Sequence, residues 1–409
     1  MRRCQSTAAL RYDYLVAGAG FAGLNAVSGL KRFKPDASVL LVDSRAEVGG
    51  SWNDYYDFCN LHAPHPTFGV AGHKWPFADP SALATRDQVL DHFSTFRRDS
   101  GVDFRGSAAA TAYERTGDGG VAATLSDGST VVAGQCVRAG GYNFAGHDGP
   151  GRDVNLPSGA AAYPEVEVRD LSAAVASAER DRTYVVVGGG KTGLDACLFL
   201  GKNKRSGDDV LLAEGRPKCF LIRDTCWPDA KNKSVFKPAV TEVFLDMILR
   251  WDGTAEAESD ILRGMVDEGH CIAISDGDPT HTELGIVSLA EAAAVRETCA
   301  RIVSGDHYAG VSTRADGGGA SIEFRRGGAH ATAKEVVIVN CRTSAPDVHA
   351  YNRDVHPRRP DGSLAAKMPN ARRTRPRCLR TPPPRSNQNS FSALSRTARP
   401  RFPRSRRLL

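Results

Sequence analysis

The sequence predicts an α/β protein with parallel sheets, and two glycine motifs with their flanking segments support this prediction. The spacing G-x-G-x-x-G occurs in "YLVAGAGFAGLNAV", residues 14–27, and again in "VVVGGGKTGLDACLFL", residues 185–200. Each motif follows a short apolar run, typical of a buried parallel strand, and precedes a helical pattern of apolar residues. Strand, glycine turn and helix are the parts of a dinucleotide-binding unit. The chain is therefore expected to contain two Rossmann-like dinucleotide-binding domains.

The glycines of each motif would let a pyrophosphate approach the backbone at the positive end of the helix. The candidate cofactor-binding residues of the first motif are Gly18, Gly20, Phe21, Ala22 and Gly23. Those of the second motif are Gly188, Gly190, Lys191, Thr192 and Gly193. Thr192 could bond the pyrophosphate and Lys191 could add charge. A glycine turn in an ordinary βαβ unit and a solvent-facing Lys–Thr pair are the alternatives.

The residues that follow each helix distinguish the two sites. An apolar run ends at Asp43, 25 residues after Gly18, and Ser44 comes next. A carboxylate there accepts hydrogen bonds from ribose hydroxyls and repels a 2′-phosphate, so the first site fits FAD or NAD. For the second site, the sequence predicts the strand "CFLIRD", residues 219–224, which places Arg223 where a guanidinium suits a 2′-phosphate. The second site therefore favours NADPH, with a surface ion pair of Arg223 as the alternative.

Two sites of different preference indicate a relay in which NADPH reduces a flavin. The segments "GAGFAGLNA", "VDSRAEVGGSWNDYYDF", "LHAPHPTFGV", "GGGKTGLDA" and "FLIRDTCW" resemble the flavin-containing and Baeyer–Villiger monooxygenases. These belong to the flavoproteins with two dinucleotide-binding domains. The Gly49-Gly50-x-Trp52 element carries much of this resemblance, which implies that the loop crosses the flavin there and that glycines allow the approach.

The resemblance implies the remaining site residues. Gly50 and Trp52 would contact FAD, and Trp52 and Asn53 would line the flavin ring and its oxygen site. His62 would lie beside the flavin, where it could donate a proton. For each, a structural role is the alternative: a packed Trp52, an Asn53 that caps a loop, and a His62 that holds a loop.

The predicted domains follow from the motifs and the family topology. Residues 11–150 would form the first part of the FAD-binding domain, with a hairpin within about 103–138 and an amphipathic helix over 85–101. Residues 180–300 would form the NAD(P)-binding domain, and residues 301–345 would return to the FAD domain. Segments 239–251 and 287–303 look helical, and 320–341 looks like a hairpin followed by a last strand.

Residues 346–409 differ from the rest of the chain in composition. The chain carries a net charge of +6, yet its last 65 residues contain 15 Arg and ten of the 22 Pro. Such a segment is short of apolar surface, so the sequence predicts a disordered basic tail. A shifted reading frame is the other explanation, and the family's last flavin-facing strand and helix would then be missing. No motif in the tail indicates specific nucleic-acid binding.

The remaining residues exclude several classes of site. None of the ten cysteines forms C-x-x-C, which argues against a dithiol reductase. His62, His65 and His73 lack the acidic or cysteine partners of a metal site, so no metal is expected. No apolar run reaches membrane-spanning length. We expect a cytoplasmic protein, with an organelle presequence in the short basic N-terminus as the alternative.

Three functions are consistent with the sequence. The first is an NADPH-dependent FAD monooxygenase, whose partners are oxygen and a small molecule with a nitrogen or sulfur nucleophile or a carbonyl. The second is a flavin-dependent reductase or NADPH oxidase without oxygen insertion. It is favoured by "AAYPEVEVRDLS", residues 161–172, where the monooxygenases usually carry Phe-x-Gly-x-x-x-His. The third is an inactive nucleotide-binding relic with an altered C-terminus.

Overall fold

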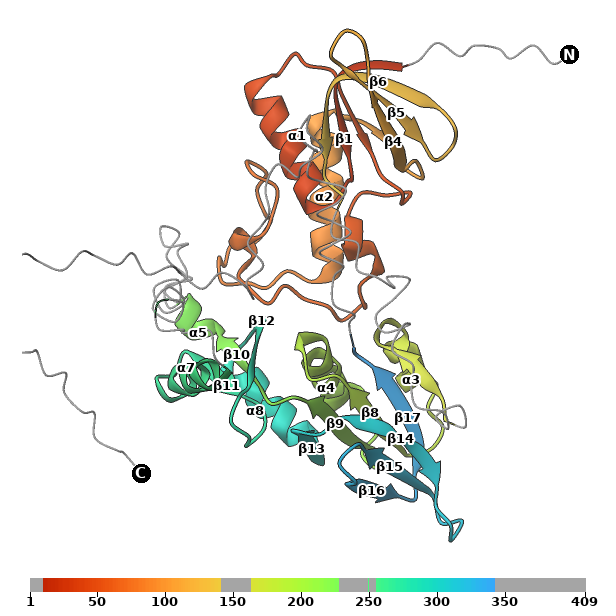
Figure 1. Cartoon of the computed structure of the whole chain (residues 1–409), viewed down its shortest axis with the longest axis vertical. Helices are drawn as coiled ribbons and strands as arrows, with labels where there is room; N and C mark the ends of the chain where they lie inside the picture. Colours follow the sequence, from red (N-terminus) through yellow and green to blue (C-terminus); the bar gives the residue numbers. More distant parts are fainter. Residues whose placement is uncertain (1–9, 141–162, 228–248, 250–254, 343–409) are drawn as a thin grey trace, which may run out of the picture. The chain divides into compact units, whose positions relative to one another are not determined.

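The first half of the chain forms a six-stranded sheet with the strand order β3-β2-β1-β6-β5-β4. The structure is a computed structural model, and it describes residues 10–140, 163–227, 249 and 255–342. Figure 1 labels β1, β4, β5 and β6 of this sheet and the helices α1 and α2. The strands are β1 (Leu10–Ala17), β2 (Val39–Val42), β3 (Asp103–Arg105), β4 (Ala110–Arg115), β5 (Val121–Leu125) and β6 (Thr130–Arg138). The helices are α1 (Phe21–Phe33), α2 (Arg86–Ser100) and the short η1 (Gly50–Asp54) and η2 (His65–Thr67).

The last three residues of β1, Leu15–Ala17, are buried, and alternate residues there belong to two different cores. Val16 packs with Leu24 and Val27 of α1, whereas Leu15 packs with residues of β5 and β6. Strands β4, β5 and β6 form an antiparallel meander, and β6 also pairs in parallel with β1. The meander therefore covers the face of the parallel strands that α1 leaves free, and the predicted hairpin around residue 127 is present.

Helix α2 illustrates how local residues set an element's ends. Thr85 and Gln88 form a complete capping box at its start, and Gly101 ends it with a φ of 59°. Its buried residues include Val89, Phe93 and Phe96, which is the face that the apolar spacing predicts.

The second half of the chain contains a five-stranded sheet with the order β13-β9-β8-β17-β7, in which neighbouring strands are parallel. Its strands are β7 (Glu165–Glu167), β8 (Arg182–Val187), β9 (Asp209–Gly215), β13 (Arg301–Ser304) and β17 (Glu335–Asn340). Its helices are η4 (Val168–Asp170), α3 (Leu171–Ala176), α4 (Lys191–Asn203) and α8 (Leu289–Thr298). Tyr184 and Val186 of β8 pack in the core that contains α4, whereas Val185 and Val187 belong to a separate core.

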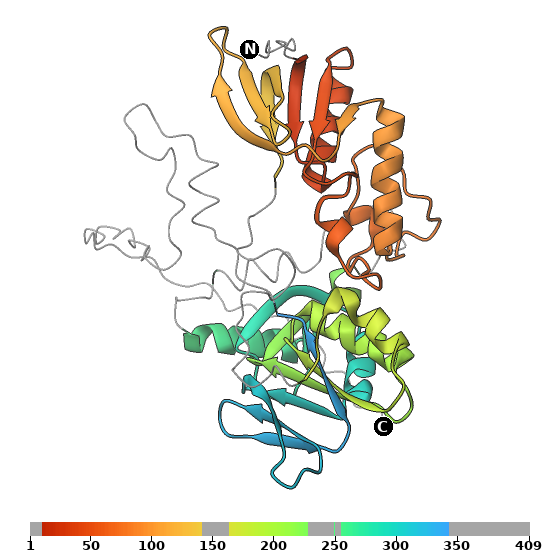
Figure 2. The same ribbon diagram turned by 90° about the vertical axis from the view of Figure 1, so that its right-hand side faces the viewer.

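That separate core joins the second sheet to a three-stranded antiparallel sheet, drawn in blue in Figures 1 and 2. Its strands are β14 (Tyr308–Thr313), β15 (Ala320–Phe324) and β16 (Ala329–Thr332). Each half of the chain therefore has the same plan: a parallel sheet with helices on one face and an antiparallel meander on the other.

This plan corrects the expectation that residues 301–345 return to the first domain. Strand β13 pairs with β9, and β17 pairs with β8 and β7. The predicted hairpin and last strand are present, but they complete the second half, as β4–β6 complete the first. The physical reason is that Val337 and Val339 pack in the core that contains α4, whereas Val336 and Ile338 pack with β14 and β15, so both faces of β17 are buried within the second half. The predicted helix over 287–303 also ends earlier, because its last residues form β13.

A smaller sheet with the order β11-β10-β12 carries the segment predicted to follow the second motif's helix. Its elements are β10 (Lys218–Ile222), β11 (Cys271–Ala273), β12 (His281–Val287), α5 (Arg223–Cys226) and α7 (Ala255–Asp267). The strand directly after α4 is β9, not β10. The expected strand over 219–224 was therefore assigned to the wrong place in the fold. The predicted helix over 239–251, apart from residue 249, and the predicted tail, 346–409, lie outside the described residues.

Candidate functional site

The first glycine turn connects β1 to α1 and has the close contacts expected of a phosphate site. A Cβ atom at Gly18 would lie 2.7 Å from the Ala139 carbonyl oxygen, and one at Gly23 would lie 1.7 Å from the Gly18 oxygen. Gly18 has a φ of +112°, which L side chains rarely adopt. Gly20 is the N-cap residue of helix α1. It provides no side-chain cap, and the first turn of the helix contains no acidic residue. Its first N–H groups therefore remain available to an anion, unlike those of α2.

Asp43 lies at the end of β2, beside this turn. Its carboxylate accepts hydrogen bonds from the N–H groups of Ala19 at 2.6 Å and Arg45 at 2.8 Å, and its side chain is buried. Ser44 follows it on the surface. The structure therefore holds the predicted ribose-binding carboxylate against the glycine turn.

The Gly49–Gly50 turn also contacts the first motif directly. The Gly49 N–H donates to the Ala19 oxygen at 2.9 Å. A Cβ at Gly50 would lie 2.8 Å from the Cα of Gly20, and both turn glycines have positive φ. Only glycine allows these two backbone segments to approach so closely, which agrees with a loop that closes over a dinucleotide.

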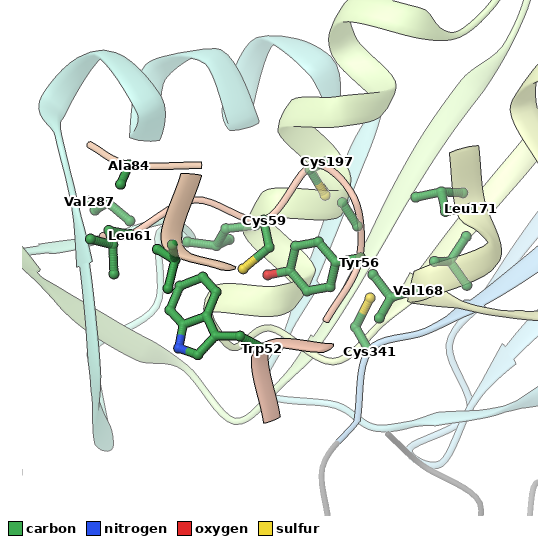
Figure 3. Close-up of a cluster of buried hydrophobic side chains, with 14 of the residues drawn as sticks. Trp52, Tyr56, Cys59, Leu61, Ala84, Val168, Leu171, Cys197, Val287 and Cys341 are labelled. Atoms are coloured by element: carbon green, nitrogen blue, oxygen red, sulfur yellow. The ribbon is translucent and has the colours of Figure 1, made fainter. Parts of the chain in front are cut away.

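Trp52 and Asn53 follow this turn within η1. Trp52 is buried against the ring of Phe68, at 5.5 Å between centroids, and Figure 3 shows it in a cluster with Tyr56 and Cys59. The Asn53 amide donates at 3.3 Å to the carbonyls of Val48 and Gly50. These contacts agree with the structural alternatives, and the roles of Trp52 and Asn53 at the flavin stay predictions. Phe21, at the start of α1, stacks on Phe68 at 4.4 Å.

Arg86 is a residue of this region that sequence analysis missed. Its guanidinium donates to the carbonyl oxygens of Trp52 and Asn53, each at 3.2 Å, so it holds the last turn of η1. Arg86 is the first residue of α2. The sequence offered no signal for this contact, because the two segments are more than 30 residues apart.

The second glycine turn repeats the first in detail. Gly188 has a φ of +118°, and a Cβ there would lie 2.8 Å from the Cys341 oxygen. Gly190 is the N-cap residue of helix α4 and provides no side-chain cap. Lys191 and Thr192 are half-buried in its first turn, and the Lys191 ammonium pairs with the carboxylate of Asp195. The turn thus places the predicted residues at an open helix end, with one ammonium group beside it.

The register of the strands identifies the counterpart of Asp43 in the second half. The Gly18 N–H donates to the Val42 oxygen, and the Gly188 N–H donates to the Ala213 oxygen. Glu214 therefore occupies the position of Asp43. Its side chain is buried, a Ser275 hydroxyl donates to it at 2.7 Å, and burial raises the pKa of the carboxyl group. Sequence analysis missed Glu214 because it took the next strand as the one that follows α4.

Arg223 does not lie at this position. It begins α5, and its guanidinium donates to the His62 oxygen at 3.0 Å and pairs with Glu291 at 2.8 Å. The prediction that Arg223 binds a 2′-phosphate is therefore wrong. The residue directly follows β10 of the smaller sheet, not the strand after α4, and its guanidinium is already paired with Glu291. Arg216, two residues after Glu214, is exposed at the end of β9.

His62 contacts β12. Its Nδ1 accepts a hydrogen bond from the Ile286 N–H at 3.1 Å, and burial together with the nearby Lys191 ammonium lowers the pKa of the ring. A neutral ring is needed at this bond because Nδ1 is the acceptor. This contact agrees with the loop-holding alternative, and proton donation by His62 stays a prediction.

The described residues contain no group of three or more His, Cys, Asp or Glu side chains that could hold a metal ion. The cysteines that the structure describes are free thiols. No helix in the described part of the chain is long and apolar enough to cross a membrane.

Comparison with known proteins agrees with this geometry. The family described as pyridine nucleotide-disulphide oxidoreductase matches residues 12–235, which is more than half of the 409 residues. The chain belongs to this family. This oxidoreductase nevertheless lacks the C-x-x-C motif of a dithiol reductase.

Curated relatives of this oxidoreductase match about half of the chain. An uncharacterised protein of Mycobacterium tuberculosis is 26% identical over 239 residues, covering 53% of this chain and 41% of its own length. The FAD-dependent monooxygenase DEP4 of Alternaria brassicicola is 26% identical over 224 residues, covering 52% of this chain and 36% of its own length. The chain thus spans less than half the length of these relatives.

Solved structures share the fold of this oxidoreductase. An open structure of cyclohexanone monooxygenase has a TM-score of 0.55 at 15% identity, covering 87% of this chain and 78% of that chain. The cyclohexanone monooxygenase from Rhodococcus sp. Phi1 bound to NADP+ has a TM-score of 0.53 at 15% identity. The match covers 87% of this chain and 75% of that chain. The predicted α/β class and the resemblance to two-domain dinucleotide-binding flavoproteins are confirmed.

Proposed function

We propose that this oxidoreductase is an FAD-dependent monooxygenase that takes its electrons from NADPH. The observation that carries the proposal is the Gly49–Gly50 turn, which is bonded to the first glycine motif beside Asp43. Its substrate would be a small molecule with a nitrogen or sulfur nucleophile or a carbonyl group. The similarity to the FAD-dependent monooxygenase DEP4 and the shared fold with the cyclohexanone monooxygenases support this choice of reaction.

The residues of the first half fit FAD. Asp43 would receive the ribose hydroxyls, and the open end of α1 would receive the pyrophosphate. Bound FAD would supply the hydride acceptor and the site of oxygen activation. The protein's part is to hold the Gly49–Gly50 turn in place through Asn53 and Arg86, and to exclude water with the buried Trp52.

The second half fits NADPH at the open end of α4. Lys191 lies beside the expected pyrophosphate, and Arg216 lies at the end of β9, where the adenosine ribose binds in such domains. The Glu214 side chain is directed to Ser275, whose hydroxyl donates to its carboxylate at 2.7 Å. We therefore assign to Arg216 the 2′-phosphate contact first expected of Arg223.

Arg216→Ala should raise the KM for NADPH about tenfold and change the KM for NADH much less, because only NADPH carries the 2′-phosphate. Both KM values would be measured from the steady-state rates of NADPH and NADH oxidation. The control is Arg98→Ala, which removes an exposed arginine that pairs with the neighbouring Asp99. Equal changes for the two nucleotides would contradict the assignment.

The proposed function is tested by the visible spectrum of the purified chain. Flavin bands should be present or appear on addition of FAD, and NADPH should bleach them without oxygen. Readmitted oxygen should then restore the bands and yield an oxygenated product from amines, sulfides or ketones. Reoxidation with release of all the reducing equivalents as hydrogen peroxide would favour the oxidase, and faster turnover with another acceptor would favour the reductase. A chain that takes up no flavin would be the inactive relic.

A further inference from the structure

Asp195 links the second glycine motif to the segment that follows η1. The carboxylate lies on α4 and its side chain is only 12% exposed. One oxygen accepts the Tyr56 hydroxyl at 2.7 Å, and the other pairs with the Lys191 ammonium. A single, mostly buried carboxylate therefore binds a neighbour on its own helix and the hydroxyl of a tyrosine 139 residues earlier in the chain.

Tyr56 belongs to a segment that packs firmly on α4. It is 8% exposed, and its ring lies 4.6 Å from that of Phe58. Phe58 in turn stacks on Phe199 of α4 at 4.3 Å. The buried cluster in Figure 3 contains Tyr56 together with Trp52 of η1 and Cys197 of α4. The Tyr56 hydroxyl is the polar contact of this aromatic cluster with α4, while the neighbouring Asp57 accepts a separate hydrogen bond from the Ser172 hydroxyl at 2.6 Å.

The same segment is continuous with the first glycine motif. Tyr56 follows η1 by two residues, and η1 follows the Gly49 N–H that donates to the Ala19 oxygen. Arg86 fixes the carbonyls at the end of η1. Tyr56 is therefore joined to the turn beside Asp43 by a short stretch of chain that is hydrogen-bonded at Gly49 and at the end of η1.

Lys191 is the group that a dinucleotide would disturb. It is the first residue of α4, where a cation is disfavoured by the helix dipole and Asp195 offsets its charge. A pyrophosphate at this helix end would attract the ammonium away from Asp195. The carboxylate would then depend more strongly on Tyr56, because a hydrogen bond to a less compensated anion is stronger.

We propose that Tyr56 is a positioning residue that couples the two dinucleotide sites through Asp195. Occupancy of the second site by the pyrophosphate of an NADP nucleotide tightens the binding of FAD at the first. This inference rests on the proposed function, since it assigns FAD and NADP to the two sites. Coupling is reciprocal, so FAD must tighten the binding of NADP+ by the same factor.

The test compares the Kd of FAD, from quenching of its fluorescence, for the flavin-free chain with and without saturating NADP+. The wild-type chain should bind FAD about 5- to 20-fold tighter with NADP+. The coupling ratio is the Kd of FAD without NADP+ divided by the Kd with saturating NADP+. In Tyr56→Phe this ratio should fall to about 1, while the Kd of FAD without NADP+ changes less than about threefold. NADP+ titrations of the flavin-free and FAD-bound chain should give the same factors.

Tyr55→Phe is the matched control. It removes the hydroxyl of the adjacent tyrosine, which accepts only from Ser51 at 3.3 Å among the hydrogen bonds between described residues. This variant should keep the wild-type ratio. Asp195→Asn should lose the coupling, and combining it with Tyr56→Phe should cause no further loss, because both changes interrupt one path.

The outcomes separate the two proposals. A wild-type ratio in Tyr56→Phe, or an equal loss in Tyr55→Phe, would overturn the role of Tyr56. A ratio near 1 in a wild-type chain that binds and uses both cofactors would overturn the coupling and leave the proposed function intact. A chain that binds no FAD would reject the proposed function itself.

Discussion

Gly18→Ala should leave the purified chain without flavin, whereas Gly188→Ala should keep the flavin and lose its reduction by NADPH. Each new Cβ would meet a carbonyl oxygen at 2.7 or 2.8 Å, and each residue has a φ near +115° that alanine adopts only under strain. Strain of this kind costs about 1–3 kcal/mol, and the collision adds to it. Each turn would move away from its nucleotide. The Kd of FAD in Gly18→Ala and the Kd of NADPH in Gly188→Ala should therefore each rise about tenfold or more.

The measurement is flavin content per chain, followed by anaerobic reduction with NADPH in a stopped-flow instrument. Gly119→Ala is a suitable control, because Gly119 has a φ of +86° in a hairpin but nothing within 4 Å of the new Cβ. It reports backbone strain alone and should retain flavin and reduction. Loss of flavin in Gly188→Ala with a folded circular dichroism spectrum would contradict the assignment of the two sites.

Acidification from pH 7 towards pH 4 should lower the free energy of unfolding by up to about 3 kcal/mol through His92 alone. The ring is 3% exposed, and its Nε2 accepts a hydrogen bond from the Val70 N–H at 3.1 Å. Burial, with a smaller effect of the nearby His73, lowers its pKa from 6.5 to about 4. His65 acts in the same sense and Asp91 opposes it.

The free energy of unfolding falls as the pH falls because the folded and unfolded chains bind different numbers of protons. Between pH 4 and pH 6.5 the unfolded chain binds the proton on this ring and the folded chain does not. The stabilisation is therefore fully present above pH 6.5 and is lost as the pH falls to about 4. Burial also lowers the pKa of His65, which adds to the same trend.

Urea unfolding at a series of pH values would measure this dependence. His92→Gln, whose amide oxygen can still accept from Val70, should be less stable at pH 7 and show a shallower slope with pH. His307→Gln removes an exposed histidine outside this cluster and should leave the slope unchanged. An unchanged slope in His92→Gln would show that other groups dominate the acid response.

Local sequence patterns predicted much of the fold. Thr85 and Gly101 marked the ends of α2 because capping and a left-handed C-terminal residue are local effects. The two glycine turns were likewise found from spacing. The partner of each late strand was not predictable, because β17 reads as a buried strand whichever parallel sheet receives it. Its place beside β8 depends on contacts about 150 residues away along the chain.

The candidate site was predicted less completely. Asp43 was found because a single strand separates it from α1. In the second half two strands, 209–215 and 218–222, follow α4 in close succession, and the polar pair Asp208–Asp209 hid the first of them. Glu214 was missed for this reason. The contacts of Tyr56 with Asp195 and of Arg86 with η1 join distant segments and leave no periodic pattern in the sequence.

The repeated plan of the two halves has a consequence for synthesis on the ribosome. Each glycine turn packs against the residue that follows the last strand of its own sheet, Ala139 for Gly18 and Cys341 for Gly188. The first turn can therefore close once about 140 residues have emerged, since domains tend to fold as they leave the ribosome. The second turn must wait for Cys341, about 150 residues after Gly188. Throughout that interval the nascent chain can already hold its first nucleotide while the second site does not yet exist.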